Sequence, residues 1–231
     1  MIGEAALVAL AAAIYLLDCV VLLERGQALF QPGRLSFGSR HYQISGRVVA
    51  LLNPLTPFLF AFRSLPLFSS GKEGVKISKA AHAVAPLALP AALQFLLVFG
   101  ALPYCLYRAP GWPFFIALVL AYLNAMLMLL VLVFGFRRNS IPARPLLGLG
   151  IGWIVCLPLS VNCLRSAGVT IPLGIDATRA IRFPVDREKA RFDLAAQVAE
   201  AMQEVEECDA RHARLAALAR QLETEASRGR L

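Results

Sequence analysis

Residues 114–136 read FFIALVLAYLNAMLMLLVLVFGF, an apolar stretch without a single charged side chain. The hydrocarbon core of a bilayer is about 30 Å thick, and a helix of about 20 apolar residues crosses it. Arg137 and Arg138 follow directly and end the stretch. Residues 114–136 therefore predict a transmembrane helix, and the rest of the chain is interpreted around it.

Three further segments have the length and composition of membrane helices. They are residues 2–24 (IGEAALVALAAAIYLLDCVVLLE), 85–107 and 145–164. Residues 48–68 are also apolar but contain Pro54, Pro57 and Pro66, which favours a segment that lies in the interface or re-enters from one side. The predicted fold class is an all-α membrane protein with about four transmembrane helices.

The composition of the whole chain supports a membrane protein. Apolar residues make up 58% and charged residues 16%, against roughly 45–50% and about 25% in soluble domains. The mean hydropathy is +0.63. The net charge of +8 could suggest nucleic acid as a partner, but the sequence has no basic stripe with interleaved aromatic residues. Nucleic-acid binding is therefore excluded.

Lysine and arginine are spread unevenly over the connections. Residues 1–164 contain twelve of them and only four acids, whereas residues 165–231 contain eleven of each sign. With four membrane helices, one side of the bilayer would receive eleven basic residues and the other only Arg108. Because basic connections face the cytoplasm, we expect residues 25–84 in the cytoplasm and the C-terminal tail outside it.

Residues 25–84 are the longest connection in the chain. Pro32-Gly33, between two short apolar stretches, predicts the turn of a small hairpin. Arg34, Arg40 and Arg47 make the connection basic, and a basic loop beside a membrane binds anionic lipid head groups. These three arginines are therefore candidate head-group ligands.

The tail begins with a linker, residues 165–185, and continues as a polar, strongly helix-forming segment, residues 186–228. Apolar side chains recur there at the a and d positions of a seven-residue repeat, which is typical of a coiled coil. The alternative is an amphipathic helix that packs on its own protein or on a partner. The residues of this seam are Leu194, Val198, Val205, Cys208, His212, Leu215 and Leu222.

Three polar residues of the expected membrane helices could form a polar path through the bundle. They are Asp18, Gln94 and Asn124. An acid inside a membrane segment is a functional candidate, although Asp18 is close enough to Glu24 and Arg25 to reach the interface. Amides in such helices more often hydrogen-bond a neighbouring helix.

Small side chains recur every four residues along residues 145–164. Such a stripe lets another helix approach closely, within the chain or in a second copy of it. The stripe consists of Gly148, Gly152, Cys156 and Ser160.

The sequence contains no motif that predicts catalysis, a metal or a cofactor. Its five cysteines form no CxxC pair, and it has only three histidines. The leading hypothesis is a non-enzymatic accessory or scaffold subunit that uses its tail to contact a membrane or periplasmic protein, or a second copy of itself. The alternatives are a small transporter or channel and, more weakly, a lipid-modifying enzyme that uses residues 34–47. The excess of arginine over lysine suggests a bacterial inner membrane.

Overall fold

The computed structural model describes residues 2–24, 26–31, 34–37, 39–64, 67, 75–108, 110–141, 144–175, 187–204 and 210–228. The chain forms two compact units, each built from segments that are far apart in the sequence. Unit 1 comprises Met1–Val21, Leu51–Phe62 and Ser78–Ile171, and unit 2 comprises Leu22–Ala50, Arg63–Ile77 and Pro172–Leu231.

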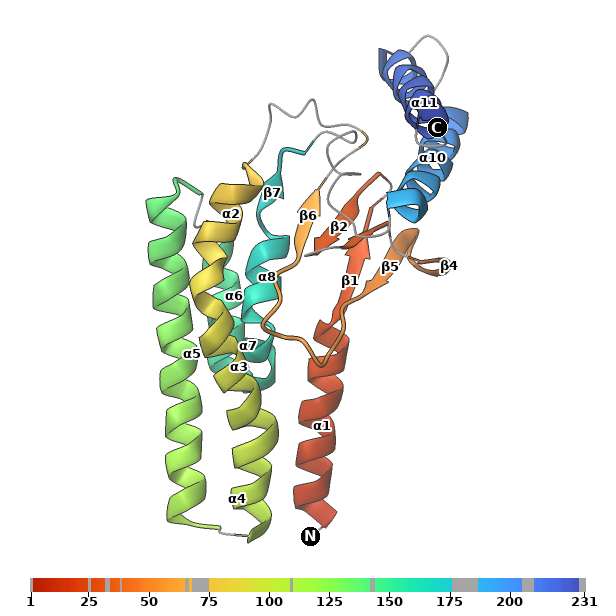
Figure 1. Cartoon of the computed structure of the whole chain (residues 1–231). Coiled ribbons are helices and arrows are strands. Elements are labelled where there is room, and N and C mark those ends of the chain that lie inside the picture. Colours follow the sequence, from red (N-terminus) through yellow and green to blue (C-terminus); the bar gives the residue numbers. More distant parts are fainter. Residues whose placement is uncertain are drawn as a thin grey trace. The chain divides into compact units, whose positions relative to one another are not determined.

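Unit 1 is mainly helical (Figure 1). The long helical run between residues 77 and 108 is subdivided by a 3-10 turn with Pro86 near its start, where the missing N–H donor is tolerated, and by a π-helical turn at Leu97–Ala101. Gly111, at φ 112°, then reverses the chain into α5, which packs against α3 and α4. The helices are α1 (Ile2–Asp18), α2 (Ile77–Val84), η1 (Ala85–Leu87), α3 (Ala88–Leu96), η2 (Leu97–Ala101), α4 (Leu102–Arg108), α5 (Trp112–Arg138), α6 (Arg144–Val155), α7 (Leu157–Val161) and α8 (Cys163–Val169).

The prediction of an all-α protein with about four transmembrane helices is wrong. Within the described part of the chain, two helical segments are long and apolar enough to cross a membrane, Ile77–Arg108 and Trp112–Arg138. They include the predicted helices 85–107 and 114–136. The structure also contains two small β-sheets, so the fold mixes helix and strand.

The other two predicted membrane helices are interrupted. Residues 2–24 form α1 only as far as Asp18 and then a β-strand, in which the β-branched Val20 and Val21 are favourable. Residues 145–164 divide among α6, α7 and α8, because Cys156 is extended and Pro158 starts α7. Within the described part of residues 48–68, the end of one strand is followed by an irregular loop at 52–61 and a second strand, Phe62–Ser64, and Pro66 lies outside the described residues.

Unit 2 contains most of the strands (Figure 1). β2 pairs antiparallel with β3, with Phe30 opposite Leu35, and this is the predicted hairpin. β4 and β5 are joined by Ser45-Gly46, both at positive φ as a two-residue hairpin turn requires. The strands are β1 (Val20–Leu23), β2 (Ala28–Gln31), β3 (Arg34–Ser36), β4 (Ser39–Ile44), β5 (Arg47–Leu51), β6 (Phe62–Ser64) and β7 (Pro172–Leu173).

The two sheets join segments from distant parts of the sequence. One has the strand order β1-β5-β4 and the other β3-β2-β6-β7. β6 runs parallel to β7, with Arg63 opposite Pro172, and Val75 forms an isolated parallel bridge with Leu173. The long basic connection and the start of the tail are therefore hydrogen-bonded to each other.

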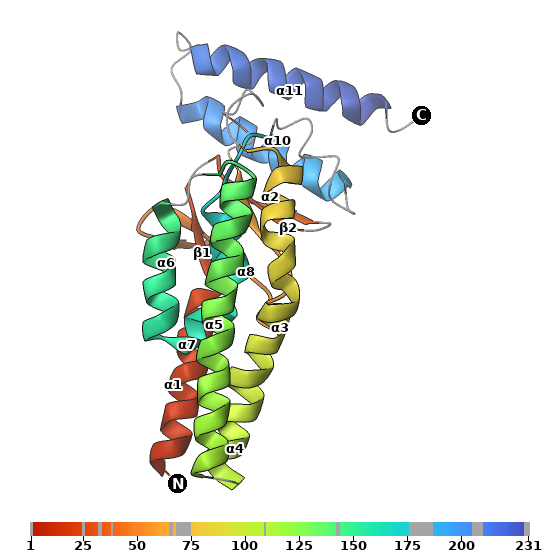
Figure 2. The same cartoon turned by 90° about the vertical axis from the view of Figure 1, so that its left-hand side faces the viewer.

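The tail forms two helices instead of one continuous helix. These are α10 (Arg187–Glu204) and α11 (Ala210–Arg228), and they pack against each other (Figure 2). The prediction of a single coiled-coil-like tail helix is therefore corrected.

Candidate functional site

One buried polar cluster connects three helices of unit 1. Gln94 of α3 donates from Nε2 to Ser160 Oγ of α7 at 2.8 Å. Asn124 of α5 donates from Nδ2 to Gln94 Oε1 at 2.8 Å and to the carbonyl of Pro90 at 2.9 Å. Ser160 Oγ in turn donates to the Leu157 carbonyl. All three polar side chains are buried.

This cluster has the chemistry of a structural cross-link. It contains amides and a hydroxyl but no group that titrates near neutral pH. The donors and acceptors named above bond to one another or to backbone carbonyls, as is common between membrane helices. The structure therefore brings Gln94 and Asn124 together, two of the three residues predicted for a polar path.

A second polar cluster surrounds Arg165, which belongs to α8 and is 1% exposed. Its Nη2 donates to the carbonyls of Asn53 and Thr56 and, at 3.2 Å, to Thr56 Oγ1. Its Nη1 donates to Asn162 Oδ1 at 3.2 Å. One guanidinium thus binds the loop at residues 52–61 to α8.

The C-terminal part of α1 completes this cluster. Tyr15 donates its hydroxyl to the Pro54 carbonyl, and its ring lies 4.9 Å from that of Phe99. Leu52 N–H donates to the Cys19 carbonyl at 3.0 Å. Asn162 Nδ2 lies 3.4 Å from Cys19 Sγ. The 52–61 loop is therefore held by both α1 and α8.

Asp18, the third predicted path residue, belongs to the Arg165 cluster and not to the amide cluster. Its carboxylate interacts with the Asn162 side chain and with the charge of Arg165, and its Oδ2 is buried without a hydrogen-bond partner. Within the described residues, no ion pair connects Arg165 to a carboxylate. The three predicted residues are thus divided between two separate clusters.

The predicted small-residue stripe has no common neighbour. A Cβ added to Gly148 would meet nothing within 4 Å, and one added to Gly152 would lie 3.8 Å from Leu159 Cδ1. Cys156 lies in the break between α6 and α7, and Ser160 belongs to the amide cluster.

Close helix contacts occur at other glycines. A Cβ on Gly135 would lie 2.4 Å from the Ala83 carbonyl oxygen, and one on Gly168 would lie 2.2 Å from that of Ala61. Both distances are far below normal contact, so these two positions require glycine for α5 to approach α2 and for α8 to approach the 52–61 loop.

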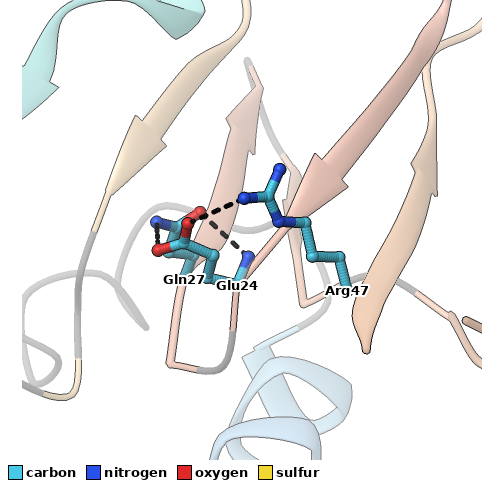
Figure 3. A network of polar contacts seen from close by, with 3 residues as sticks. All are labelled: Glu24, Gln27 and Arg47. Atoms are coloured by element: carbon cyan, nitrogen blue, oxygen red, sulfur yellow. Dashed lines mark hydrogen bonds and ion pairs between the residues drawn. The ribbon is translucent and has the colours of Figure 1, made fainter. Parts of the chain in front are cut away.

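The candidate lipid-binding arginines lie on the strands of unit 2. Arg34 is exposed at the start of β3, and the side chain of Arg40 lies outside the described residues. Arg47 Nη2 is 3.7 Å from Glu24 Oε1, and Gln27 bonds the same glutamate through its side chain (Figure 3). An exposed pair of this kind contributes about 0–1 kcal/mol.

Four residues of the predicted tail seam are buried within this chain. Leu194 and Val198 of α10 and Leu215 and Leu222 of α11 are buried, and the two helices contact each other. His212 is half-buried on α11. Val205 and Cys208 lie outside the described residues. This is the packing of amphipathic helices on their own protein, the alternative to a self-paired coil.

Sequence reasoning missed Arg165, Tyr15 and Asn162. Arg165 directly follows the apolar stretch 145–164 and was included in the linker 165–185. The signal that could have found it is Asp18, an acid within the apolar stretch 2–24, which lies near Arg165 in the structure. Among the described residues, no group of three or more His, Cys, Asp or Glu side chains could hold a metal ion. No protein-family model, no curated protein and no solved structure matches this chain.

Proposed function

We propose that this chain is an integral membrane protein without catalytic activity, an accessory or scaffold subunit that presents unit 2 to a partner. One observation carries the membrane assignment. In each candidate span, only 33% of the most apolar 18-residue window is buried inside the protein. A core helix of a soluble protein would be mostly buried, and an apolar surface of this extent is unfavourable in water.

The buried part of α5 is a narrow stripe. It includes Ala117, Ala121, Ala125 and Met128, at helical spacing. Large apolar side chains cover the rest of the helix, among them Phe115, Leu123 and Phe134, each more than half exposed. A helix with one packed stripe and an apolar remainder suits a hydrocarbon environment.

The two ends of the helix pair support an orientation. Tyr104, Tyr107 and Trp112 are exposed at one end, where interfacial aromatic residues are typical of membrane helices. Lys79 and Arg138 are exposed at the other. By the positive-inside rule, the end with the basic residues faces the cytoplasm.

Strand pairing extends this topology to the tail. Val75, two residues before α2, bridges to Leu173. Residues 75 and 173 therefore lie on the same side of the bilayer. The two spans, Ile77–Arg108 and Trp112–Arg138, cross the bilayer once in each direction, so the end of α5 returns to that side. Residues 144–171 thus start and finish on the side where residue 75 lies. This supports a cytoplasmic tail, in place of the extracytoplasmic one expected from four membrane helices.

The hydrogen bonds of the buried amide cluster favour the scaffold hypothesis over a channel. A solute path needs polar groups that are available to the solute, whereas Gln94, Asn124 and Ser160 bond to one another and to carbonyls. The observation that favours the alternative, a small transporter or channel, is the unpartnered Oδ2 of Asp18.

Labelling in intact cells tests the topology. Cysteine variants of Gly111 and Ala217, compared with the wild-type chain, would be treated with a membrane-impermeant maleimide. We expect labelling at 111 in intact cells and at 217 only after permeabilisation. Equal labelling of both in intact cells would contradict the cytoplasmic tail.

Site-specific photo-crosslinking tests the scaffold function. A photoreactive residue replacing Ala217, which is exposed on α11, should give one discrete crosslinked product, and the same residue at Leu123 should give none with protein. Failure to crosslink at 217, together with solute flux through proteoliposomes that Asp18→Asn abolishes, would favour the transporter.

A further inference from the structure

We propose that the junction of α2 and α5, at the cytoplasmic end of the helix pair, binds an anionic phospholipid. Its phosphate lies between Lys79 of α2 and Arg138 of α5, and its acyl chains follow the exposed apolar side chains of the two helices. Both cations belong to unit 1 and are exposed. The inference rests on the membrane assignment proposed above and adds to it a lipid ligand of defined charge.

The contact between α2 and α5 sets the level of the two cations. Gly135 lies against Ala83, since a Cβ on the glycine would be 2.4 Å from the Ala83 carbonyl oxygen, and Figure 1 shows α2 beside the C-terminal end of α5. Lys79 precedes Ala83 by about one helical turn, toward the end of the pair. Arg138 follows Gly135 by about one turn in the same direction. The two cations therefore lie at the same level, on helices that touch.

Helical periodicity puts both cations on one side of this contact. Successive residues are about 100° apart round a helix, so Lys79 lies about 40° from Ala83 round α2. Arg138 lies about 60° from Gly135 round α5. Because the two helices are antiparallel and both right-handed, these displacements fall on the same side of the pair. Arg137, about 160° from Gly135, is on the face of α5 away from α2.

Exposed apolar side chains continue from the cations toward the middle of the helices. On α5, Phe134 lies one turn before Arg138 and is more than half exposed, and Leu127, two turns further, is half exposed. On the other helical run, Leu89 at the start of α3 is more than half exposed. Cations above apolar side chains match an amphiphile that has an anionic head and hydrocarbon chains.

Acidic residues are missing from the sequence around the two cations. Residues 74–175 contain no aspartate or glutamate, and within the described residues neither Lys79 nor Arg138 has an ion-pair partner. Glu73, the nearest acid in the sequence, lies outside the described residues. The two cations therefore face anions of the environment, and at the level of a helix end these are the phosphates of lipid head groups.

Arg138 is not needed to cap α5. Cations in the last turn of a helix often bond its final carbonyls, but other donors occupy them here. Asn139 Nδ2 donates to the Gly135 carbonyl at 2.8 Å. The N–H groups of Ser140 and Ile141 donate to two further carbonyls of the last turn at 3.1 and 2.9 Å, with Ser140 at φ 52–56° replaced by its own value of 56° as such a cap requires. The guanidinium of Arg138 therefore keeps its donors for a ligand, and their planar fork suits a phosphate.

Quenching of tryptophan fluorescence by brominated lipids tests the proposal. The single tryptophan is Phe134→Trp, one turn from Arg138, or Leu123→Trp, about 22 Å from Arg138 along α5, in a background with Trp112 and Trp153 changed to phenylalanine. The bilayers mix phosphatidylcholine with phosphatidylglycerol, one of them brominated in its acyl chains. The degree of quenching gives the relative binding constant of the two lipids. We expect phosphatidylglycerol to be favoured about fivefold or more at 134 and not at 123.

Variants that each remove one positive charge separate a site from general attraction to a basic surface. In the Phe134→Trp protein, Lys79→Gln and Arg138→Gln should each lower the preference for phosphatidylglycerol about fivefold, whereas Arg137→Gln should leave it unchanged. An equal loss in all three variants would overturn the site. Inorganic phosphate, added at constant ionic strength, should not change the preference, and loss of the preference there would overturn the lipid as the ligand.

The two tryptophans distinguish failure of the lipid site from failure of the membrane assignment. Quenching at both positions, with a relative binding constant near 1 at 134, would overturn the site and leave the membrane assignment intact. No quenching at either position in a fully brominated bilayer would overturn the membrane assignment itself. Quenching at 123 without quenching at 134 would show that protein covers the junction, which also overturns the site.

Discussion

The contact between α2 and α5 allows a prediction with a matched control. Replacing Gly135 by alanine puts a Cβ 2.4 Å from the Ala83 carbonyl oxygen. The contacted atom is backbone, so a rotamer change cannot relieve the clash and the two helices must separate. Overpacking of this kind costs about 1–3 kcal/mol. The better helix propensity of alanine offsets up to about 1 kcal/mol of this cost.

Gly148→Ala is the control because it gains the same propensity without a clash, since nothing lies within 4 Å of its added Cβ. We expect Gly135→Ala to range from nearly neutral to about 3 kcal/mol less stable than wild type, and Gly148→Ala to be equal or up to about 1 kcal/mol more stable. The difference between the variants, about 1–3 kcal/mol, is the measure of the contact. Reversible unfolding by SDS in mixed micelles gives both values, and equal midpoints for the two variants would refute the close approach of α2 and α5.

Three further predictions address the clusters and the tail. Asn124→Ala removes the donor to Gln94 Oε1 and should lower stability by about 1–3 kcal/mol in the same unfolding assay; an unchanged midpoint would argue against the amide cluster. Leu194→Ala, at a fully buried position, should destabilise the α10–α11 pair by about 2–5 kcal/mol. The loss is measured as faster hydrogen exchange in α11. The control Phe192→Ala, at a position 75% exposed, should change the stability of the pair by less than about 0.5 kcal/mol. The Cys208 thiol should remain reduced if the tail is cytoplasmic, so a Cys208-dependent dimer on a non-reducing gel would place the tail on the other side.

Two of the four long apolar stretches were predicted correctly as long helical segments. Residues 114–136 and 85–107 fall inside the two candidate spans, because a continuous apolar stretch bounded by charges has few other stable conformations. The hairpin at residues 28–37 was also predictable, since Pro-Gly between two short apolar stretches indicates a turn.

The failures have identifiable physical causes. Hydropathy does not distinguish the end of a helix from a buried strand, so β1 was assigned to the first helix although Val20 and Val21 favour a strand. Pro158 was underestimated as a start of a new helix within residues 145–164. In the tail, an a/d pattern is produced equally by one long coiled coil and by two helices that fold back on each other.

The candidate site was predictable only in part. Gln94, Asn124 and Asp18 were recognised because polar residues are rare in apolar stretches, but the partners of each depend on tertiary contacts. Arg165 contacts residues 53 and 56, more than a hundred positions earlier in the chain. A charge after an apolar stretch usually marks the membrane surface, and nothing local distinguishes such a residue from a buried one.

The position of Arg165 also changes how the basic residues of the chain should be interpreted. As determinants of the proposed topology, the lysines and arginines of residues 1–164 act only through their number on each side of the bilayer, so in that role each cation is interchangeable with its neighbours. Arg165 is different, because its donors are committed to specific carbonyls and lysine could not reproduce the planar arrangement. Asp18 lies beside it with one buried oxygen unpaired, and a polar atom of that kind is costly unless it has a function. If the chain does move an ion or a proton, Asp18 beside Arg165 is therefore the place to look, whereas the amide cluster already has a sufficient structural explanation.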